Sequence, residues 1–290
     1  MQTDLLGKKR WKVNFHMHTT LSDGAKTPDE ALSIYKNAGY DAVALTDHWR
    51  YGEAGDFEGM AVLSGVEYNT RGGDGIKGFF HVVGVGLESE PGADEISRDS
   101  SVQELIDAIR AHGGLAILAH PAWSLNPPDV LATLRNVDAT EIYNTISGVH
   151  MSRRADSSLI LDMLACKGVF WPLLATDDVH AYDTDGPVSW VMVECAAPTR
   201  DELLGAVREG RFYATQGPEV HIWRDGDFFI VRSSPVREVV VQSNTAWAPR
   251  VFVGDGLTET KYKINGNDAF VRAEVTDVYG RKAWTNFVHC

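Results

Sequence analysis

The chain has 290 residues, a formal net charge of −13, 44% hydrophobic residues and 23% charged residues. This composition is typical of a globular protein with one or two domains, and it disfavours intrinsic disorder. The acidic balance disfavours binding to duplex nucleic acid, and the lack of a long apolar run disfavours a membrane-spanning segment.

The cysteines and the N-terminus bear on the cellular compartment. Cys166, Cys195 and Cys290 lie far apart and form no CxxC pair. We therefore expect reduced thiols and a cytoplasmic protein. The basic triplet at residues 8–10 is followed by no apolar stretch, so we expect no signal peptide. A mature secreted form that has lost its leader stays open as an alternative.

Strand and helix patterns alternate from residue 11 to about residue 207. Continuous apolar stretches predict buried strands at residues 13–15, 42–45, 61–66, 79–85, 115–119, 139–143, 170–175 and 189–194. Capping signals and helical periodicity predict helices at residues 27–37, 101–112, 127–135, 157–165 and 199–209. About seven such units predict an α/β fold with a parallel sheet closed into a barrel.

The pattern changes after Gly217. Short alternating strands without helices follow at residues 220–223, 228–231, 236–242, 250–253, 269–276 and 282–287. Asn265-Gly266-Asn267 is predicted to form a hairpin turn. We therefore expect a barrel domain at residues 1–216 and a small antiparallel, β-sandwich-like domain at residues 217–290.

Histidines and carboxylates gather at the ends of the predicted strands. Ends of parallel strands converge on one rim of a barrel, so these side chains can meet although they are far apart in sequence. Imidazole and carboxylate together suit Mn, Fe or Zn, and a bound cation lowers the pKa of water enough to supply a nucleophile. The motifs are His16-Met17-His18, Asp23, Asp47-His48, Glu67, His81, Ala119-His120-Pro121 and Asp177-Asp178-Val179-His180.

Taken in order, these motifs resemble the PHP family, the polymerase and histidinol phosphatase metal-dependent phosphoesterases, over residues 11–215 approximately. The resemblance implies a distorted (β/α)7 TIM-like barrel with two or three divalent cations at its rim. It would place one cation on His16, His18, Glu67 and Asp178. A second would share Glu67 and add His81 and His120, and a third would be held by Asp23, His48 and His180.

The Asp177-Asp178 pair leaves a choice of ligand. The D-x-H pattern of the family selects Asp178, and strand alternation agrees because Asp178 and His180 share a face. Asp177 is expected behind the ligands. Asp47 is a candidate catalytic acid, with hydrogen bonding to a ligand imidazole as the alternative role.

Further candidates concern the substrate. Arg153 and Arg154, together with Asn144, are candidates for holding a substrate phosphate, and a solvated basic pair is the alternative reading of the arginines. Trp49 and Trp123 follow predicted ligands, and they either pack in the core or wall the pocket.

The sequence therefore predicts a metal-dependent phosphoesterase that hydrolyses a small phosphomonoester, such as a nucleotide or sugar phosphate, by metal-activated hydroxide. The first alternative is a hydrolase of a carboxyl ester, amide or carbamate that uses the same site. The second is a scaffold whose β module binds a partner or glycan. Unused metal ligands buried in a scaffold would lack partners, which disfavours that reading.

Overall fold

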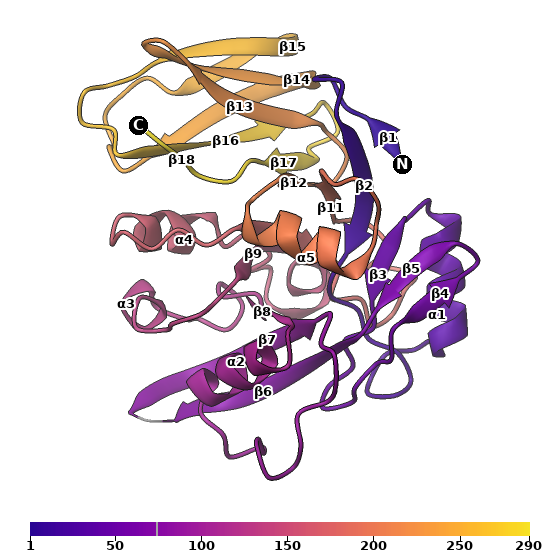
Figure 1. The fold of residues 1–290 in the computed structure, drawn as a ribbon. Helices are drawn as coiled ribbons and strands as arrows, with labels where there is room; N and C mark the ends of the chain where they lie inside the picture. The colour runs from indigo at the N-terminus through magenta and orange to yellow at the C-terminus, as the bar shows by residue number, and fades with distance from the viewer. Residues whose placement is uncertain (74) are drawn as a thin grey trace.

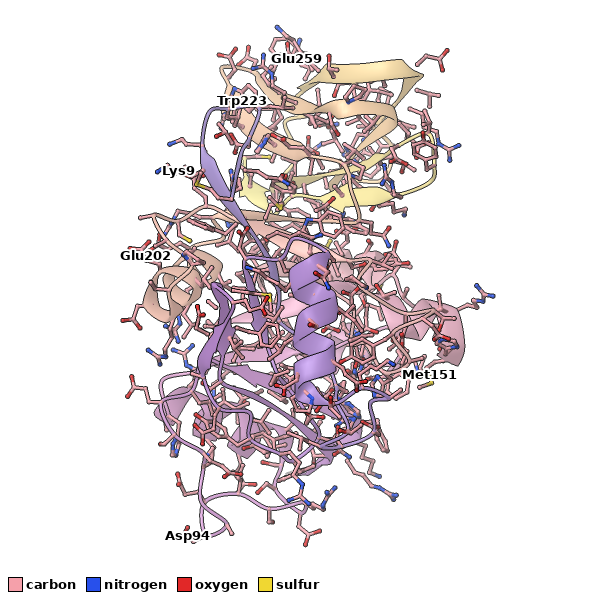
Figure 2. All side chains as sticks on the ribbon, turned by 90° about the vertical axis from the view of Figure 1, so that its right-hand side faces the viewer. Lys9, Asp94, Met151, Glu202, Trp223 and Glu259 are labelled. Atoms are coloured by element: carbon pink, nitrogen blue, oxygen red, sulfur yellow. The ribbon has the colours of Figure 1, made fainter. Side chains whose placement is uncertain are left out.

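The computed structural model describes residues 1–73 and 75–290, which form a mixed α/β fold built on two sheets. One sheet contains 13 strands and the other five. Figure 1 shows the C-terminal strands gathered at one end of the molecule and the five-stranded sheet at the other. In the perpendicular view of Figure 2, Trp223 and Glu259 mark the first end, and Asp94 marks the opposite one.

The five-stranded sheet is mixed. Its order is β10-β9-β8-β7-β6, with β8, β9 and β10 parallel and with β7 antiparallel to both of its neighbours. Three helices follow its strands, namely α2 (Val102–Ala111), α3 (Pro128–Leu131) and α4 (Ser158–Ala165). The strands are β6 (Gly65–Gly73), β7 (Ile76–Val85), β8 (Leu115–Leu118), β9 (Ala139–Asn144) and β10 (Leu173–Thr176).

The larger sheet joins the N-terminal strands to the C-terminal module. Its main path is β13-β14-β16-β17-β12-β11-β2-β3-β5-β4. The N-terminal strands are β1 (Gln2–Thr3), β2 (Lys9–Asn14), β3 (Ala42–Ala44), β4 (Gly55–Phe57) and β5 (Met60–Leu63). Strands β11 (Trp190–Val193) and β12 (Phe212–Thr215), from later in the chain, lie between them and the C-terminal module. Helix α1 (Pro28–Asn37) follows β2, and helix α5 (Arg200–Arg208) follows β11.

The two sheets come together where the polar motifs lie. Isolated parallel bridges pair Met17 with Val179 and His48 with Glu67, so they join segments of the two sheets. The predicted α/β class is confirmed. The expectation of an all-parallel sheet is wrong, because β11 runs antiparallel to β2 and β7 runs antiparallel to β6 and β8. The regular (β/α)7 barrel stays a prediction.

Local signals account well for the helix starts. Thr27 and Glu30 form the predicted capping box of α1, and Ser101 and Glu104 form another at α2. The helix predicted at residues 127–135 is shorter, since α3 ends at Leu131. Beyond it the chain continues in tight i→i+3 turns, with the Leu134 amide donating to the Leu131 carbonyl.

The C-terminal module is built around one long strand, β14 (Phe228–Ser243). Residues 228–231 and 236–242 are two segments of this strand, separated by irregular pairing. It pairs with β13 (Val220–Asp225), β15 (Val251–Lys263) and β16 (Phe270–Thr276). The Asn265-Gly266-Asn267 hairpin prediction is therefore wrong: the segment turns, but the strands on either side of it both pair with β14.

The module continues the larger sheet. Strand β17 (Lys282–Trp284) pairs with both β12 and β16, and β18 (Val288–His289) pairs with β16. A second apolar cluster contains Phe229, Val239 and Val275 of the module, and it also takes in Met192 of β11 and Tyr213 of β12. A domain boundary between residues 216 and 217 remains a prediction. Among the described residues, no helix is long and apolar enough to cross a membrane.

Candidate metal centre

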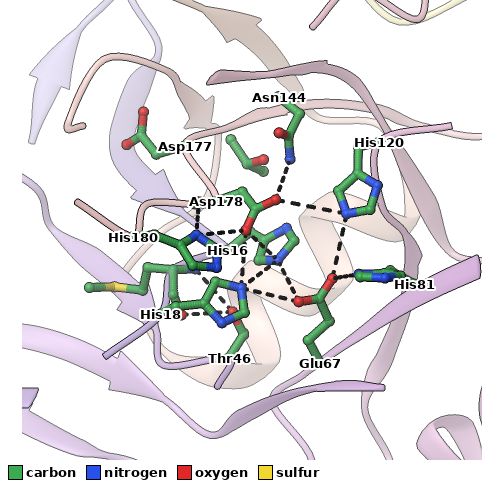
Figure 3. A network of polar contacts seen from close by, with 12 residues as sticks. His16, His18, Thr46, Glu67, His81, His120, Asn144, Asp177, Asp178 and His180 are labelled. Atoms are coloured by element: carbon green, nitrogen blue, oxygen red, sulfur yellow. Dashed lines mark hydrogen bonds and ion pairs between the residues drawn. The ribbon is translucent and has the colours of Figure 1, made fainter. Parts of the chain in front are cut away.

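The structure brings all nine predicted ligands to one place. His16 and His18 follow β2, and His48 follows β3. Glu67 and His81 lie within β6 and β7, His120 follows β8, and Asp178 and His180 follow β10. Figure 3 shows seven of these side chains pointing toward one another: His16, His18, Glu67, His81, His120, Asp178 and His180. Strand topology therefore explains how residues far apart in sequence meet.

The first group is tightly packed. The Nε2 atoms of His16 and His18 lie 3.2 Å apart. Glu67 Oε2 lies 3.3 Å from His16 Nε2 and 3.1 Å from His18 Nε2. Asp178 Oδ1 lies 3.3 Å and 3.0 Å from the same two atoms. These four residues form one of the metal-sized donor groups of the described chain.

The second oxygen of Glu67 faces a different pair of imidazoles. Oε1 lies 2.8 Å from His81 Nδ1 and 3.6 Å from His120 Nε2. Asp178 Oδ2 lies 3.8 Å from the same His120 atom. Glu67 thus stands between two groups of donors, one for each oxygen, which is the arrangement expected of a carboxylate that bridges two cations.

The third group opens toward solvent. Asp23 Oδ1 lies 3.4 Å from His180 Nε2, and Asp23 Oδ2 lies 3.9 Å from His48 Nε2. His48 contacts both this group and the first one, which was not predicted, because its Nδ1 lies 3.1 Å from Glu67 Oε2. Asp23 is about half exposed, whereas Glu67 is fully buried.

Unpartnered polar atoms show that these residues fit cations. His48 Nδ1, Glu67 Oε2, His81 Nε2 and Asp178 Oδ1 are buried and make no hydrogen bond. Leaving such atoms unsatisfied is costly, at about 1–3 kcal/mol each. Divalent cations coordinated by imidazole nitrogen and carboxylate oxygen would satisfy them.

The backbone is strained at two of these positions. His120 has a φ of 30° and Asp178 a φ of 51°, where a glycine would meet less steric resistance. Non-glycine residues in this region cost on the order of 1–3 kcal/mol and cluster at functional sites. A glycine would carry no donor atom, so the strain is consistent with a requirement for these side chains.

The charges of the cluster shift one another. Burial by itself would lower the pKa of His18, but the carboxylates of Asp178 and Glu67 beside it raise it to about 9. Burial would raise the pKa of Asp178, yet the imidazoles of His16 and His18 hold it well below its usual range. Without cations, the cluster therefore holds protons on imidazoles beside ionised carboxylates, and cation binding must displace those protons.

Glu141 of β9 is a site residue that sequence reasoning missed. Its Oε1 lies 2.7 Å from His16 Nδ1 and accepts a 2.7 Å hydrogen bond from Thr176. Its Oε2 accepts from the His120 amide and from Asn144 Nδ2, each at 2.8 Å. Glu141 thereby orients the His16 ring so that Nε2 faces the cluster. A glutamate within the stretch predicted to be a buried strand, residues 139–143, was the available signal.

Asp47 is hydrogen-bonded to a turn, and its role as a catalytic acid stays a prediction. Its oxygens accept from the Thr19 amide at 2.7 Å, the Thr19 hydroxyl at 2.8 Å and the Ser22 hydroxyl at 2.7 Å. The expected hydrogen bond to an imidazole is therefore wrong. Asp47 instead fixes the turn that carries Asp23. Gly24 closes this turn, because a Cβ there would lie 2.4 Å from the His18 carbonyl oxygen.

The aspartate pair divides as expected. Asp178 faces the cluster, whereas Asp177 points away from it (Figure 3). Asp177 accepts from the Tyr35 hydroxyl at 2.8 Å and from the Ser189 amide at 2.7 Å. Burial raises the pKa of Asp177 to about 6, despite these donors. Its contacts tie the segment after β10 to α1 and to β11.

The predicted substrate residues do not meet in one place. Asn144 donates to Asp178 Oδ2 at 3.1 Å, and its carbonyl oxygen accepts from the Ser147 hydroxyl at 2.7 Å. The side-chain amide of Asn144 therefore holds a predicted ligand and a loop, which argues against substrate binding. Arg153 and Arg154 are exposed and lie outside the wall of the cavity at the cluster.

The cavity at the cluster is small. Its volume is about 180 Å³. Trp123 walls it and lies edge-on to His120, with ring centroids 4.9 Å apart. Trp49 packs on Tyr68 instead and donates to Asn69. The cavity is lined by Asp23, His48, His81, His120, Trp123, Ile146, Ser147, Met151, Asp178 and His180, none of which is lysine or arginine.

Comparison with known proteins identifies one relative by sequence. An uncharacterized protein of Methanocaldococcus jannaschii, MJ1587, is 31% identical over 127 residues, which are 38% of this chain and 67% of that protein. No family model matches the chain.

Solved structures provide a comparison of the fold. A two-domain protein from Bacteroides vulgatus, described as containing a predicted PHP-like metal-dependent phosphoesterase, matches with a TM-score of 0.55 and 17% identity, over 96% of this chain and 93% of that one. A putative metal-dependent phosphoesterase from Bifidobacterium adolescentis matches with a TM-score of 0.41 and 14% identity, over 60% of this chain and 89% of that one.

The first of these solved structures confirms the PHP resemblance at the level of the fold, and it extends the likeness to the C-terminal module. The chain belongs to the same family as the Methanocaldococcus jannaschii protein and has the fold of a PHP-like protein with a second domain.

Proposed function

We propose that this protein is a metal-dependent phosphoesterase that hydrolyses a small phosphomonoester. The observation that carries the proposal is the convergence of nine imidazole and carboxylate side chains on one centre, four of them with a buried atom that lacks a hydrogen-bond partner. Two or three cations held there would polarise a phosphoryl group and lower the pKa of a coordinated water. Their charge would also make a positive pocket in an acidic protein.

Different residues of the chain would hold the cations, orient the ligands and exclude water. His16, His18, Glu67 and Asp178 would hold one cation. Glu67 would share a second with His81 and His120, and Asp23, His48 and His180 would hold a third. Glu141 and Asn144 would keep ligands oriented, and Trp123 would keep water from one side of the reacting group. We further propose that the two sheets are the halves of an irregular barrel, because bridges join them on both sides of this centre.

Carboxyl ester, amide or carbamate hydrolysis is the second candidate. The residues that line the cavity include no lysine or arginine, so no protein cation is placed to select a phosphoryl group over a carbonyl group. Selection would depend on the metal ions alone, and these polarise either group.

A substrate panel tests the proposal. The purified full-length chain, loaded in turn with Mn²⁺, Fe²⁺ and Zn²⁺, would be assayed on p-nitrophenyl phosphate, p-nitrophenyl acetate and nucleoside monophosphates. We expect hydrolysis of phosphomonoesters, with competitive inhibition by inorganic phosphate and with loss of activity in His18→Ala. Turnover of the acetate alone, with no inhibition by phosphate, would favour the second candidate.

A further inference from the structure

The loop of residues 145–156, called here the 145–156 loop, forms part of the cavity wall. It contributes Ile146, Ser147 and Met151 to the wall, and a π-helical turn (η1, Ser147–Met151) forms its tip. Figure 2 shows Met151 at the outer side of the molecule, and its side chain is more than half exposed. π-Helical turns are rare and are frequent at functional sites. The position of this loop therefore determines the shape of the cavity.

The loop is closed at its base by backbone pairing. The Asn144 amide donates to the Ala155 carbonyl at 3.0 Å, and an isolated bridge pairs Tyr143 with Asp156. The tip packs directly on this base, since a Cβ placed on Gly148 would lie 2.8 Å from the Ala155 Cβ. A shift of the base therefore moves the tip, because no free space between them absorbs it.

Strand β17 of the C-terminal module contacts this base on both sides. Lys282 Nζ lies 3.2 Å from Asp156 Oδ2 and 2.6 Å from Glu274 Oε1. The indole of Trp284, two residues further along β17, donates to Glu274 Oε2 at 3.1 Å. The Trp284 ring stacks on Tyr143, with centroids 5.3 Å apart. The two sides of the base, Tyr143 and Asp156, are therefore both held by β17.

We propose that Lys282 is a positioning residue for the candidate active site: through Asp156 it fixes the 145–156 loop, so that the C-terminal module holds part of the substrate-binding wall in place. The expected change in KM rests on the proposed function, whereas the expected change in the 145–156 loop rests on geometry alone. Lys282 touches neither the cluster nor the cavity wall, so its effect passes through the loop.

The kinetic consequence is specific. If only a fraction of molecules hold the loop in place, the apparent affinity for substrate falls by that fraction. A partly exposed ion pair changes such an equilibrium by about two- to five-fold. Lys282→Met is therefore expected to raise the KM for p-nitrophenyl phosphate by at most about five-fold, and to leave kcat unchanged because the metal ligands are untouched.

Matched variants separate positioning from general destabilisation. Lys282→Arg keeps the charge and is expected to restore the wild-type KM. Asp156→Asn is expected to repeat the Lys282→Met change, and the double variant is expected to add nothing further. Lys263→Met removes an exposed lysine from β15 of the same module and serves as the control.

Amide hydrogen exchange of the metal-loaded full chain gives a readout that needs no catalysis. Residues 145–156 should exchange faster in Lys282→Met and Asp156→Asn than in the wild type or Lys263→Met. This result would support the positioning role even if no phosphomonoester is hydrolysed, an outcome that would refute the proposed function alone. Unchanged exchange in this segment, or a fall in kcat at constant KM, would overturn the inference.

Discussion

Glu141 offers a sharp test of how the ligand cluster is held, through the substitution Glu141→Gln. Each carboxylate oxygen has two polar partners, His16 and Thr176 on one side and His120 and Asn144 on the other. The glutamine amide must replace one oxygen, and either orientation turns an NH₂ group toward groups that donate hydrogen bonds.

The two orientations have different costs. If the NH₂ group faces His120 and Asn144, it meets only hydrogen-bond donors. The buried N–H groups of these residues then lack an acceptor, which lowers the stability of the fold by about 1–3 kcal/mol. Facing His16, it can donate to Nδ1 only if the ring proton moves to Nε2. Nε2 is the nitrogen that faces Glu67 and Asp178, and once protonated it could no longer coordinate a cation.

We therefore expect Glu141→Gln to bind Mn²⁺ about 10- to 100-fold more weakly, the usual effect of losing a carboxylate behind a ligand histidine. Calorimetric titration of the metal-free protein measures this affinity, and thermal unfolding with and without Mn²⁺ measures stability. Glu53→Gln makes the same charge change at an exposed position and is the control. Wild-type Mn²⁺ affinity and unchanged unfolding in Glu141→Gln would refute the assigned role.

Three further predictions concern charge. Asp178→Asn should abolish binding of at least one cation in a metal analysis, whereas Asp177→Asn should keep the metal content and lose about 1–3 kcal/mol of stability. The folded pKa of His18, about 9, exceeds the usual 6.5, so its contribution is complete below pH 6.5 and is lost as pH rises toward 9. Metal-free protein should therefore lose up to about 3 kcal/mol across that window, measured by urea unfolding, while Mn²⁺ affinity rises; a flat profile would contradict the assignment. Asp162→Ala should cost about 3–5 kcal/mol in urea unfolding, because it leaves the fully buried Arg272 without the carboxylate 2.6 Å away, and a loss below 1 kcal/mol would count against this pair.

The sequence indicated the residues of the cluster because their chemistry is visible in their spacing. His16 and His18 share a face in extended chain, and the other motifs stand at or near the ends of apolar stretches, as the structure shows. Selecting Asp178 over Asp177 followed from the same alternation. The capping boxes at Thr27 and Ser101 marked helix starts because they depend on neighbours three residues away.

Other features depend on contacts that no local pattern encodes. The antiparallel directions of β7 and β11 are set by pairing across the sheet, and apolar composition alone does not specify strand direction. Glu141 and Asn144 orient ligands through tertiary hydrogen bonds, and Asp47 turned out to serve a turn. The grip of Lys282 on Asp156 joins residues 126 positions apart in the chain.

Anomalous diffraction from crystals of the protein grown with Mn²⁺ tests the central claim most directly. The account predicts anomalous peaks within coordination distance of His16, His18, Glu67 and Asp178, with Glu67 bridging to a second peak beside His81 and His120. An ordered cluster without such peaks, or peaks only at the separate Asp4, Glu219 and His221 group, would contradict it.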